Sequence, residues 1–343
     1  MDDTPSQMRH EVLEIPDATE RLLTDGAPAI RAAAAALRSL DPPFLTTVAR
    51  GSSDHVATYL KYVAELLLGV PVASVGPSVA SIYRAPLRLG GSGCLAISQS
   101  GQSPDIVELA RSATAGGAVT LALTNHPGSP MAQASTHCLD IQAGPELSVA
   151  ATKTFVNSAI AGLMLLAEWR QDAELLAAIH ALPEALARAT QIDWPEFRNA
   201  VSGWSSLFTL GRGPGFAISN EAALKFKETC RIHAESYSSA EVLHGPVSIV
   251  DQGFPVLGLA AGDAAEEVLV AVADGLAAQG AAAFVTSGRA ATAARLPCIR
   301  TAHPLTDPIA LITSFYAMVE RLAVARGIDP DAPRHLKKVT ETV

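Results

Sequence analysis

The chain is poor in cysteine and shows no cluster of metal-binding residue types. Its four cysteines, Cys94, Cys138, Cys230 and Cys298, have no CxxC spacing and stand in apolar surroundings. We therefore interpret them as reduced thiols of the core. Histidine, cysteine and carboxylate residues do not gather at the spacing of a metal site, so we predict no metal ion. No GxSxG elbow or GxxxxGK[ST] loop is present either.

Positive charge is scarce as well. The formal net charge is −9, which argues against broad binding of nucleic acid, because such binding needs a basic surface. Only six lysines occur, and four of them form two close pairs, Lys225 with Lys227 and Lys337 with Lys338. Chance and a coding bias towards arginine are an alternative explanation of that clustering.

Long apolar runs and a secretory signal are also missing. No apolar run approaches the ~20 residues of a membrane span, because charges interrupt the apolar segments. Residues 1–17 are polar and acidic, without the basic and then apolar order of a signal peptide. We expect a cytoplasmic protein that binds neither membrane nor nucleic acid. The 343 residues, 49% of them hydrophobic, are enough for two domains with substantial cores.

What the chain has is an alternation of apolar strands and amphipathic helices. Strands are predicted at 44–49, 70–75, 93–98, 119–124 and 137–141, and helices at 30–40, 54–68, 105–115 and 150–169. This order predicts an α/β fold with a mostly parallel sheet, doubly wound and flavodoxin-like, flanked by helices. Ligands of such sheets bind beyond the carboxyl ends of the strands.

The second half repeats this order. Strands at 206–211, 255–259 and 282–286 and helices at 264–279 and 308–326 suggest an internal duplication of one α/β unit. We expect an N-terminal lead at 1–29, domains at 30–185 and 186–332, and a C-terminal tail at 333–343.

The loop from Ser98 to Ser103 is the first candidate site. A short apolar strand ends there in hydroxyl residues and a glycine, and a helix opens with Pro104. Backbone N–H groups, hydroxyls and the helix dipole would converge on one point, which suits a phosphate, although a helix cap alone explains the same residues. The equivalent loop of the second half, 258–266, has no hydroxyl, and its Asp263 and Glu266 would repel an anion. Serines are therefore not needed merely to build the turn.

A second candidate lies between Asn220 and His244. Glu221, Lys225 and Glu228 are spaced i, i+4, i+7 and share one helix face, either as a catalytic group or as a solvated stripe of ion pairs. His244, followed by Gly-Pro, suits a proton shuttle near neutral pH or a structural cap.

Motifs along nearly the whole chain resemble those of sugar isomerase (SIS) domains. They are Arg50-Gly51-Ser52-Ser53, Ile97-Ser98-Gln99-Ser100-Gly101, Ala143 to Lys153, Leu210-Gly211-Arg212-Gly213, Glu221 to Glu228, Ile232-His233-Ala234-Glu235, Leu243-His244-Gly245-Pro246 and Pro333 to Lys338. Their order is similar to the tandem-SIS isomerase half of glutamine–fructose-6-phosphate aminotransferase and to stand-alone SIS-type glucosamine-6-phosphate deaminases. The resemblance implies two tandem SIS domains.

The resemblance also implies roles for individual residues. It assigns the sugar phosphate to Ser53, Ser98, Gln99, Ser100 and Ser103, the lining of the sugar pocket to Val149 and Ala151, and support of the site to Lys225. It gives the proton transfer between C1 and C2 to Glu228 and ring opening to His244 from the neighbouring subunit of a homodimer. It brings Lys338 to the sugar carbonyl.

Departures from the family pattern shape the expected reaction. Arg50 replaces a small residue, Gln102 an acidic one and Ser103 a threonine, and we expect no glutaminase domain before the first strand. We therefore expect isomerisation with deamination of an amino-sugar 6-phosphate, first of all glucosamine 6-phosphate to fructose 6-phosphate plus ammonia. No metal or organic cofactor is expected, because the substrate's own carbonyl is the electron sink. The alternatives are a fructosamine-6-phosphate deglycase, another phosphosugar isomerase, or a non-catalytic sugar-phosphate sensor.

Overall fold

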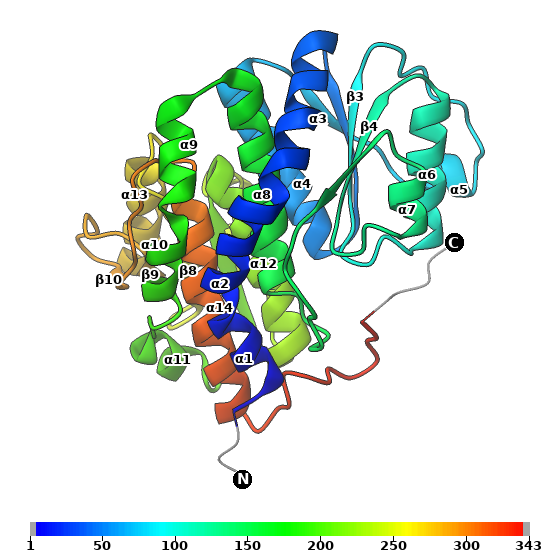
Figure 1. The fold of residues 1–343 in the computed structure, drawn as a ribbon. Helices are drawn as coiled ribbons and strands as arrows, with labels where there is room; N and C mark the ends of the chain where they lie inside the picture. Colours follow the sequence, from blue (N-terminus) through cyan, green and yellow to red (C-terminus); the bar gives the residue numbers. More distant parts are fainter. Residues whose placement is uncertain (1–4, 339–343) are drawn as a thin grey trace. The chain divides into compact units, whose positions relative to one another are not determined.

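The computed structural model describes residues 5–338 and divides into two compact units, each with its own five-stranded parallel sheet (Figure 1). The first unit contains Pro16–Glu146, Lys153–His180 and residues 336–338. The second contains residues 5–15, Leu147–Thr152 and Ala181–His335. Both units interleave in the sequence, because a short loop of one lies within the chain of the other.

The first unit is built on the sheet β2-β1-β3-β4-β5, in which every neighbouring pair is parallel. Its elements in chain order are α2 (Ile15–Arg21), the π-turn Leu22–Gly26, α3 (Ala27–Leu40), β1 (Leu45–Val48), α4 (Ser52–Leu68), β2 (Val72–Ser74), α5 (Ser78–Ser81), β3 (Gly93–Ile97), α6 (Pro104–Ala115), β4 (Val119–Thr124), α7 (Pro130–Gln133), β5 (His137–Asp140), α8 (Lys153–Arg170) and α9 (Ala173–His180). Helices α3, α4 and α8 cover one face of the sheet and α5, α6 and α7 the other (Figure 1). This is the doubly wound, flavodoxin-like order that the sequence predicts.

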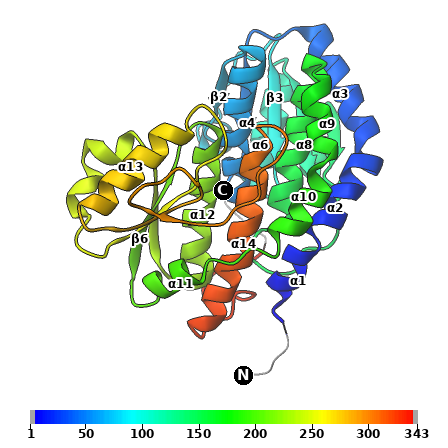
Figure 2. The same ribbon diagram turned by 90° about the vertical axis from the view of Figure 1, so that its left-hand side faces the viewer.

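The second unit repeats that order around β10-β9-β8-β6-β7, again all parallel. Its elements are α1 (Gln7–Leu13), α10 (Leu182–Ala189), α11 (Pro195–Val201), β6 (Ser206–Gly211), α12 (Pro214–Cys230), β7 (His233–Ser238), the 3-10 turns η2 (Glu241–His244) and η3 (Pro246–Ile249), β8 (Pro255–Gly258), α13 (Glu266–Ala278), β9 (Ala282–Val285), β10 (Ala294–Arg295) and α14 (Asp307–Ala325). Figure 2 shows α13 on one face of this sheet and α12 and α14 on the other. In both units the first strand lies between the second and the third, which is what an internal duplication requires.

The turn after the first strand has the same backbone in both copies. Gly51 has φ 54° and ψ −134°, and Gly213 has φ 56° and ψ −136°. A residue with a side chain rarely adopts a positive φ, so glycine is needed where the chain turns from the strand into α4 or α12. An arginine, Arg50 or Arg212, precedes the glycine each time.

Helix α14 corrects one expectation. It is long and apolar enough to cross a membrane by length and composition, and it is the one helix of residues 5–338 that meets this test. However, 83% of its apolar window is buried inside the protein, where it packs against α1, α10 and α12. The sequence analysis expected no such segment, because it counted unbroken apolar runs. A core helix that is buried on all sides can contain scattered polar residues and still have a high mean hydropathy.

Strand β7 and helix α1 are among the elements that the sequence analysis did not predict. Strand β7 lies at the edge of its sheet and is only partly buried, so it lacks an apolar pattern. The polar lead contains helix α1, whose first turn is capped by Asp331: its carboxylate accepts hydrogen bonds from the N–H groups of Gln7 and Met8, both at 2.7 Å. Ser6, the N-cap residue, also accepts a hydrogen bond from the N–H of Arg9 at 3.0 Å, so a local capping signal was present and the sequence analysis overlooked it.

The four cysteines are free thiols, and their burial makes a labelling prediction. Burial raises the pKa of Cys94 to about 11 and that of Cys230 to about 12. Because alkylation needs the thiolate, we expect iodoacetamide at pH 8 to leave these two residues unmodified in the native protein and to label all four after unfolding. Peptide mass spectrometry measures this. Native labelling of Cys94 as fast as in the unfolded chain would contradict the packing around β3.

Candidate functional site

The predicted phosphate loop lies at the point where the strand order of the first sheet reverses. Strands β1 and β3 are neighbours, but their connections to the next strands, β2 and β4, run to opposite sides. Ligands of doubly wound sheets bind at this reversal, beyond the carboxyl ends of the strands. The loop from Ser98 to Ser103 follows β3, and Arg50 to Ser53 follow β1.

A hollow of about 310 Å³ occupies this place. Its lining residues are Arg50, Gly51, Ser53, Ile97, Ser98, Gln99, Ser100, Ser103, Ile106 and Lys338. All five residues that the sequence assigns to the phosphate are among them, together with the predicted catalytic lysine. Such a volume suits a small ligand or one end of it.

Hydroxyl groups both shape the loop and remain able to donate. The Oγ of Ser98 accepts a hydrogen bond from the N–H of Gly101 at 3.2 Å, and the Oγ of Ser100 accepts one from Gln102 at 3.3 Å. Accepting uses a lone pair and leaves the O–H as a donor. These two serines therefore shape the loop before α6 and do not cap the helix, whose N-cap residue Ser103 makes no side-chain capping hydrogen bond.

Two cations line the hollow, and each is held by a buried carboxylate. The Nε and Nη2 atoms of Arg50 lie 2.9 and 2.8 Å from the Oδ2 of Asp105. The Nζ of Lys338 lies 2.6 Å from the Oε2 of Glu146. Both carboxylates are completely shielded from solvent, whereas 52% of the Arg50 side chain and 23% of the Lys338 side chain are exposed. The charged ends that solvent or a ligand can reach are therefore positive.

Glu146 also fixes the start of α8. Its two carboxylate oxygens accept hydrogen bonds from the N–H of Thr154 at 3.1 Å and from its hydroxyl at 2.7 Å. The helix begins at Lys153, three residues later than the predicted 150, and this carboxylate satisfies one of the N–H groups of its first turn.

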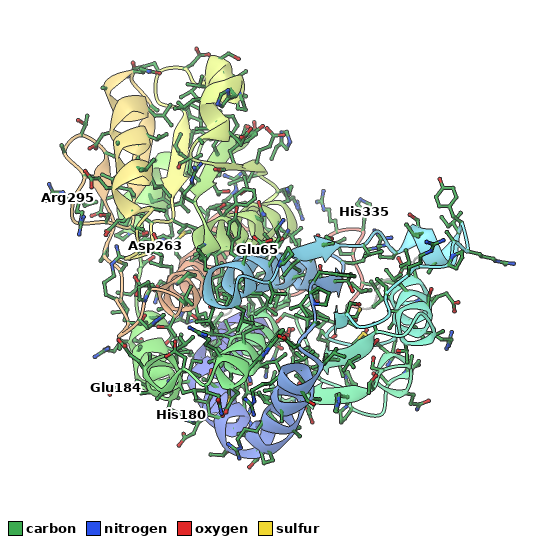
Figure 3. The ribbon with its side chains drawn as sticks, turned by 90° about the horizontal axis from the view of Figure 1, so that it is seen from above. Glu65, His180, Glu184, Asp263, Arg295 and His335 are labelled. Atoms are coloured by element: carbon green, nitrogen blue, oxygen red, sulfur yellow. The ribbon has the colours of Figure 1, made fainter. Side chains whose placement is uncertain are left out.

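The equivalent loop of the second unit binds a carboxylate of the protein itself. After β8, the N–H of Gly262 donates to the Oδ2 of Asp307 at 2.7 Å, and Arg300 binds the same oxygen at 2.9 Å. Arg300 also pairs with Glu266 at 2.8 Å, and the neighbouring Asp263 is labelled in Figure 3. The loop amide and the nearby cation are thus occupied by carboxylates, which supports the prediction that this copy does not take a phosphate.

The predicted Glu221–Lys225–Glu228 face is buried, so it is not a solvated stripe. The Nζ of Lys225 lies 3.1 Å from the Oε1 of Glu221 and 2.5 Å from the Oε2 of Glu228, and Tyr316 donates to Glu221 at 3.1 Å. Burial disfavours the charged amine, but the two carboxylates outweigh it and raise the pKa of Lys225 above its usual value. Lys225 and Glu221 are fully buried, whereas 18% of the Glu228 side chain is exposed. Glu228 is therefore the one of these three charged side chains that solvent can reach.

The other predicted residues are His244, Val149 and Ala151. His244 ends the turn η2 and is exposed, beside Gly245 with φ 140°. Its neighbours Leu243 and Ile249 are 53% and 54% exposed, which is high for apolar side chains. Val149 and Ala151 lie half-buried in the loop before α8, where the N–H of Val149 donates to the carbonyl of Asp331 at 3.3 Å.

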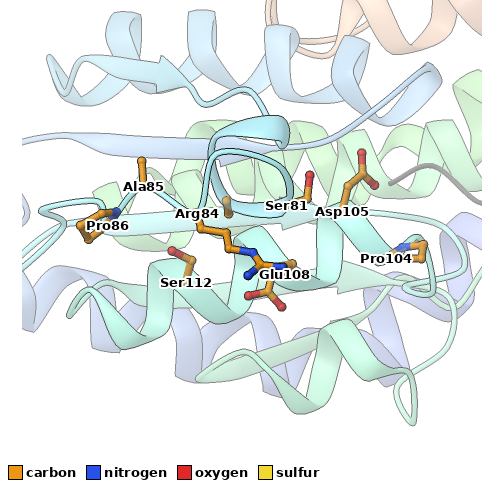
Figure 4. A pocket seen from close by; sticks show the side chains of 9 residues that line it. Ser81, Arg84, Ala85, Pro86, Pro104, Asp105, Glu108 and Ser112 are labelled. Atoms are coloured by element: carbon orange, nitrogen blue, oxygen red, sulfur yellow. The ribbon is translucent and has the colours of Figure 1, made fainter.

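A second hollow, of about 660 Å³, lies in the first unit beside the start of α6 (Figure 4). Arg84, Glu108 and Asp105 are among its lining residues and are labelled in the figure. None of the sequence-predicted site residues lines it. Asp105 therefore borders this hollow while its carboxylate holds Arg50 in the other one.

Comparison with known proteins identifies the fold. The SIS domain model matches residues 45–168 and again 201–325, which are the two sheet-bearing parts of the chain. The chain belongs to the SIS domain family. The double match confirms the predicted duplication.

The curated relatives of this SIS protein include glutamine–fructose-6-phosphate aminotransferases. It is 34% identical over 316 residues to the glutamine–fructose-6-phosphate aminotransferase of Aeropyrum pernix, covering 86% of this chain and 50% of the relative. The enzyme of that name from Leifsonia xyli is 32% identical, over 97% of this chain and 58% of the relative. The chain thus spans about half the length of the curated relatives it matches.

Solved structures share the fold over almost the whole chain. A protein from Silicibacter pomeroyi DSS-3, provisionally assigned as a phosphosugar isomerase, is 64% identical with a TM-score of 0.93, over 95% of this chain and 100% of the other. A glucosamine-6-phosphate deaminase from Thermotoga maritima has a TM-score of 0.73 at 18% identity, over 95% of this chain and 100% of the other. The second likeness shows the fold alone.

The sequence analysis did not predict the carboxylates that pair with Arg50 and Lys338 in the hollow at the strand reversal. The sequence predicts no role for Glu146, which lies within the motif from Ala143 to Lys153, and it places Asp105 only at the start of a helix. Arg50 was noted as a departure from the family pattern. That departure was the one available signal, because the partners of these cations are distant in the chain.

Proposed function

We propose that this SIS protein isomerises and deaminates an amino-sugar 6-phosphate, converting glucosamine 6-phosphate and water to fructose 6-phosphate and ammonia. The observation that carries the proposal is the hollow at the strand reversal, where Ser53, Ser98, Gln99, Ser100 and Ser103 meet two cations. Neutral donors together with positive charge suit a phosphate dianion.

The proposed chemistry divides between binding and proton transfer. The serine loop anchors the phosphate, and Val149 and Ala151 line the sugar pocket. His244 opens the ring. Glu228 removes the proton at C2 and returns it at C1, which turns the C2 amine into an imine. Water then hydrolyses that imine to the C2 ketone and ammonia.

The environment of Glu228 supports its role as the base. Its Oε2 accepts from Lys225, and among residues 5–338 no hydrogen bond reaches its Oε1. A partly exposed carboxylate whose one oxygen is oriented by a buried ammonium keeps the other oxygen available for a proton. A sugar-phosphate sensor would not need such an arrangement, so the enzyme is favoured over the sensor.

Lys338 is proposed to act at the substrate in its charged form. Its ammonium pairs with Glu146 at the hollow, so it is placed to donate a hydrogen bond to a substrate oxygen.

We further propose a cytoplasmic homodimer in which His244 serves the site of the neighbouring subunit. The support is the exposed position of His244 between Leu243 and Ile249, two apolar side chains that gain from being covered. The proposal includes no metal, no organic cofactor, no nucleic acid and no membrane partner.

The test is ammonia release from a panel of phosphorylated amino sugars. We expect ammonia and fructose 6-phosphate in equal amounts from glucosamine 6-phosphate, measured by coupled assays. Release from a fructosamine 6-phosphate instead would favour the deglycase, and isomerisation without ammonia a plain isomerase. Tight binding with no product from any of them would favour the sensor.

A further inference from the structure

We propose that Arg50, held in place by Asp105, is an additional phosphate-binding residue that supplies charge to the serine loop. This inference rests on the proposed function, in which the loop receives the phosphate of the sugar. The family motifs assign no role to this position, where a small residue is usual.

The position of Arg50 follows from the turn after β1. Arg50 precedes Gly51, whose positive φ turns the chain towards α4, and its side chain lines the same hollow as the serines. In the second unit Arg212 occupies the same position, but its guanidinium binds the hydroxyl of Ser238 at 3.0 Å. Only in the first unit does this arginine pair with the helix that follows the third strand.

The guanidinium keeps donors for a ligand. A guanidinium has five N–H groups, and the Oδ2 of Asp105 accepts a hydrogen bond from the Nε of Arg50 and lies 2.8 Å from its Nη2. Among the residues that the structure describes, no other hydrogen bond or salt bridge involves this side chain. The Nη1 group is therefore available, on a side chain that is half exposed at the hollow.

The negative charge of Asp105 has to be neutralised if a phosphate is to bind at this loop. Its carboxylate is fully shielded from solvent, and its Oδ1 accepts from the N–H of Ile106 at 2.8 Å. A buried carboxylate at the start of α6 would repel a phosphate bound there, unless a cation neutralises it. Arg50 neutralises Asp105, and Asp105 in turn fixes the direction in which the planar guanidinium points.

The charges around Arg50 are few. Lys338 is the other cation of the hollow, and it is matched by Glu146. Asp54, in the first turn of α4, also feels Arg50: burial raises the pKa of this carboxyl, while His55 and Arg50 act in the opposite direction. With a phosphate bound, Arg50 can contribute both charge and unused donors in addition to those of Lys338.

The test compares Arg50→Met, Asp105→Asn, the double variant, and Arg111→Met as the control. Arg111 forms an ion pair with Glu108 on the same helix α6 and lines neither hollow, so its loss should leave binding unchanged. Affinities for fructose 6-phosphate and inorganic phosphate are measured by calorimetry, and folding by thermal unfolding.

We expect Arg50→Met to weaken both ligands by about 10- to 100-fold, as the loss of a charge-assisted hydrogen bond does. The single variant also leaves Asp105 unpaired, and it could unfold for that reason. The double variant removes the buried charge as well, so it should fold stably and still bind weakly. Asp105→Asn keeps the cation but loosens it, and its loss should be smaller.

Two outcomes separate this inference from the proposed function. A stably folded double variant with wild-type affinity would overturn the inference, because Arg50 would then serve only to neutralise Asp105. A wild-type protein that binds phosphate ligands through Arg50 but releases no ammonia would overturn the proposed reaction alone. A wild-type protein that binds neither ligand would overturn both.

Discussion

Replacing Glu228 with glutamine is expected to abolish turnover of glucosamine 6-phosphate while leaving the binding of fructose 6-phosphate largely intact. An amide cannot take up the C2 proton, and general base catalysis of this kind contributes roughly 10²–10⁴-fold to the rate. The phosphate loop belongs to a different sheet from the helix that carries Glu228. Binding and chemistry should therefore separate in this variant.

The control variants are chosen with regard to the buried ammonium of Lys225, which lies beside Glu228. Glu228→Gln leaves Lys225 with Glu221 as its remaining carboxylate, so the charge stays paired and the protein should fold. Glu228→Asp keeps the charge but withdraws it by one methylene, and a small residual activity is expected. Glu267→Gln alters an exposed carboxylate of α13 and should be silent. Full activity of Glu228→Gln, with thermal unfolding unchanged, would exclude Glu228 as the base.

Features coded by neighbouring residues were predictable from the sequence. The alternation of strands and helices gave both sheets, and the serine run after an apolar strand located the loop that lines the hollow. The i, i+4, i+7 spacing placed Glu221, Lys225 and Glu228 on one face correctly, because a helix fixes that geometry by itself. Whether the face is buried was not predictable, since it depends on Tyr316 and α14 far along the chain.

The charge arrangement of the hollow was not predictable for the same reason. Arg50 and Asp105 are 55 residues apart, and Glu146 and Lys338 are 192 apart. A sequence shows that a cation exists but not which carboxylate holds it. The edge strand β7 was missed because half-exposed polar residues carry no apolar signal. Helix α1 was missed although Ser6 caps it locally, and its second capping group, Asp331, comes from the far end of the chain.

Mixing two inactive variants is expected to restore activity if His244 serves the neighbouring subunit. Glu228→Gln and His244→Asn each disable every site of their own homodimers. In a mixed dimer, one site combines an intact Glu228 with an intact His244 from the other chain. With equal amounts of the two chains, half of the dimers are mixed and each has one working site, so about one quarter of the wild-type activity should return.

The experiment is co-expression of the two variants with different affinity tags and assay of the doubly purified mixed dimer. Each variant alone should stay inactive and should elute as a dimer on gel filtration. A mixed dimer without activity would contradict the proposal, because a His244 that served its own subunit would leave a defect in both sites.

The proposed dimer also predicts an effect of the two exposed apolar residues beside His244. Replacing Leu243 and Ile249 with serine should weaken the dimer and lower activity at low protein concentration, while the monomer stays folded. Activity independent of dilution in that variant would separate His244 from any contact between subunits.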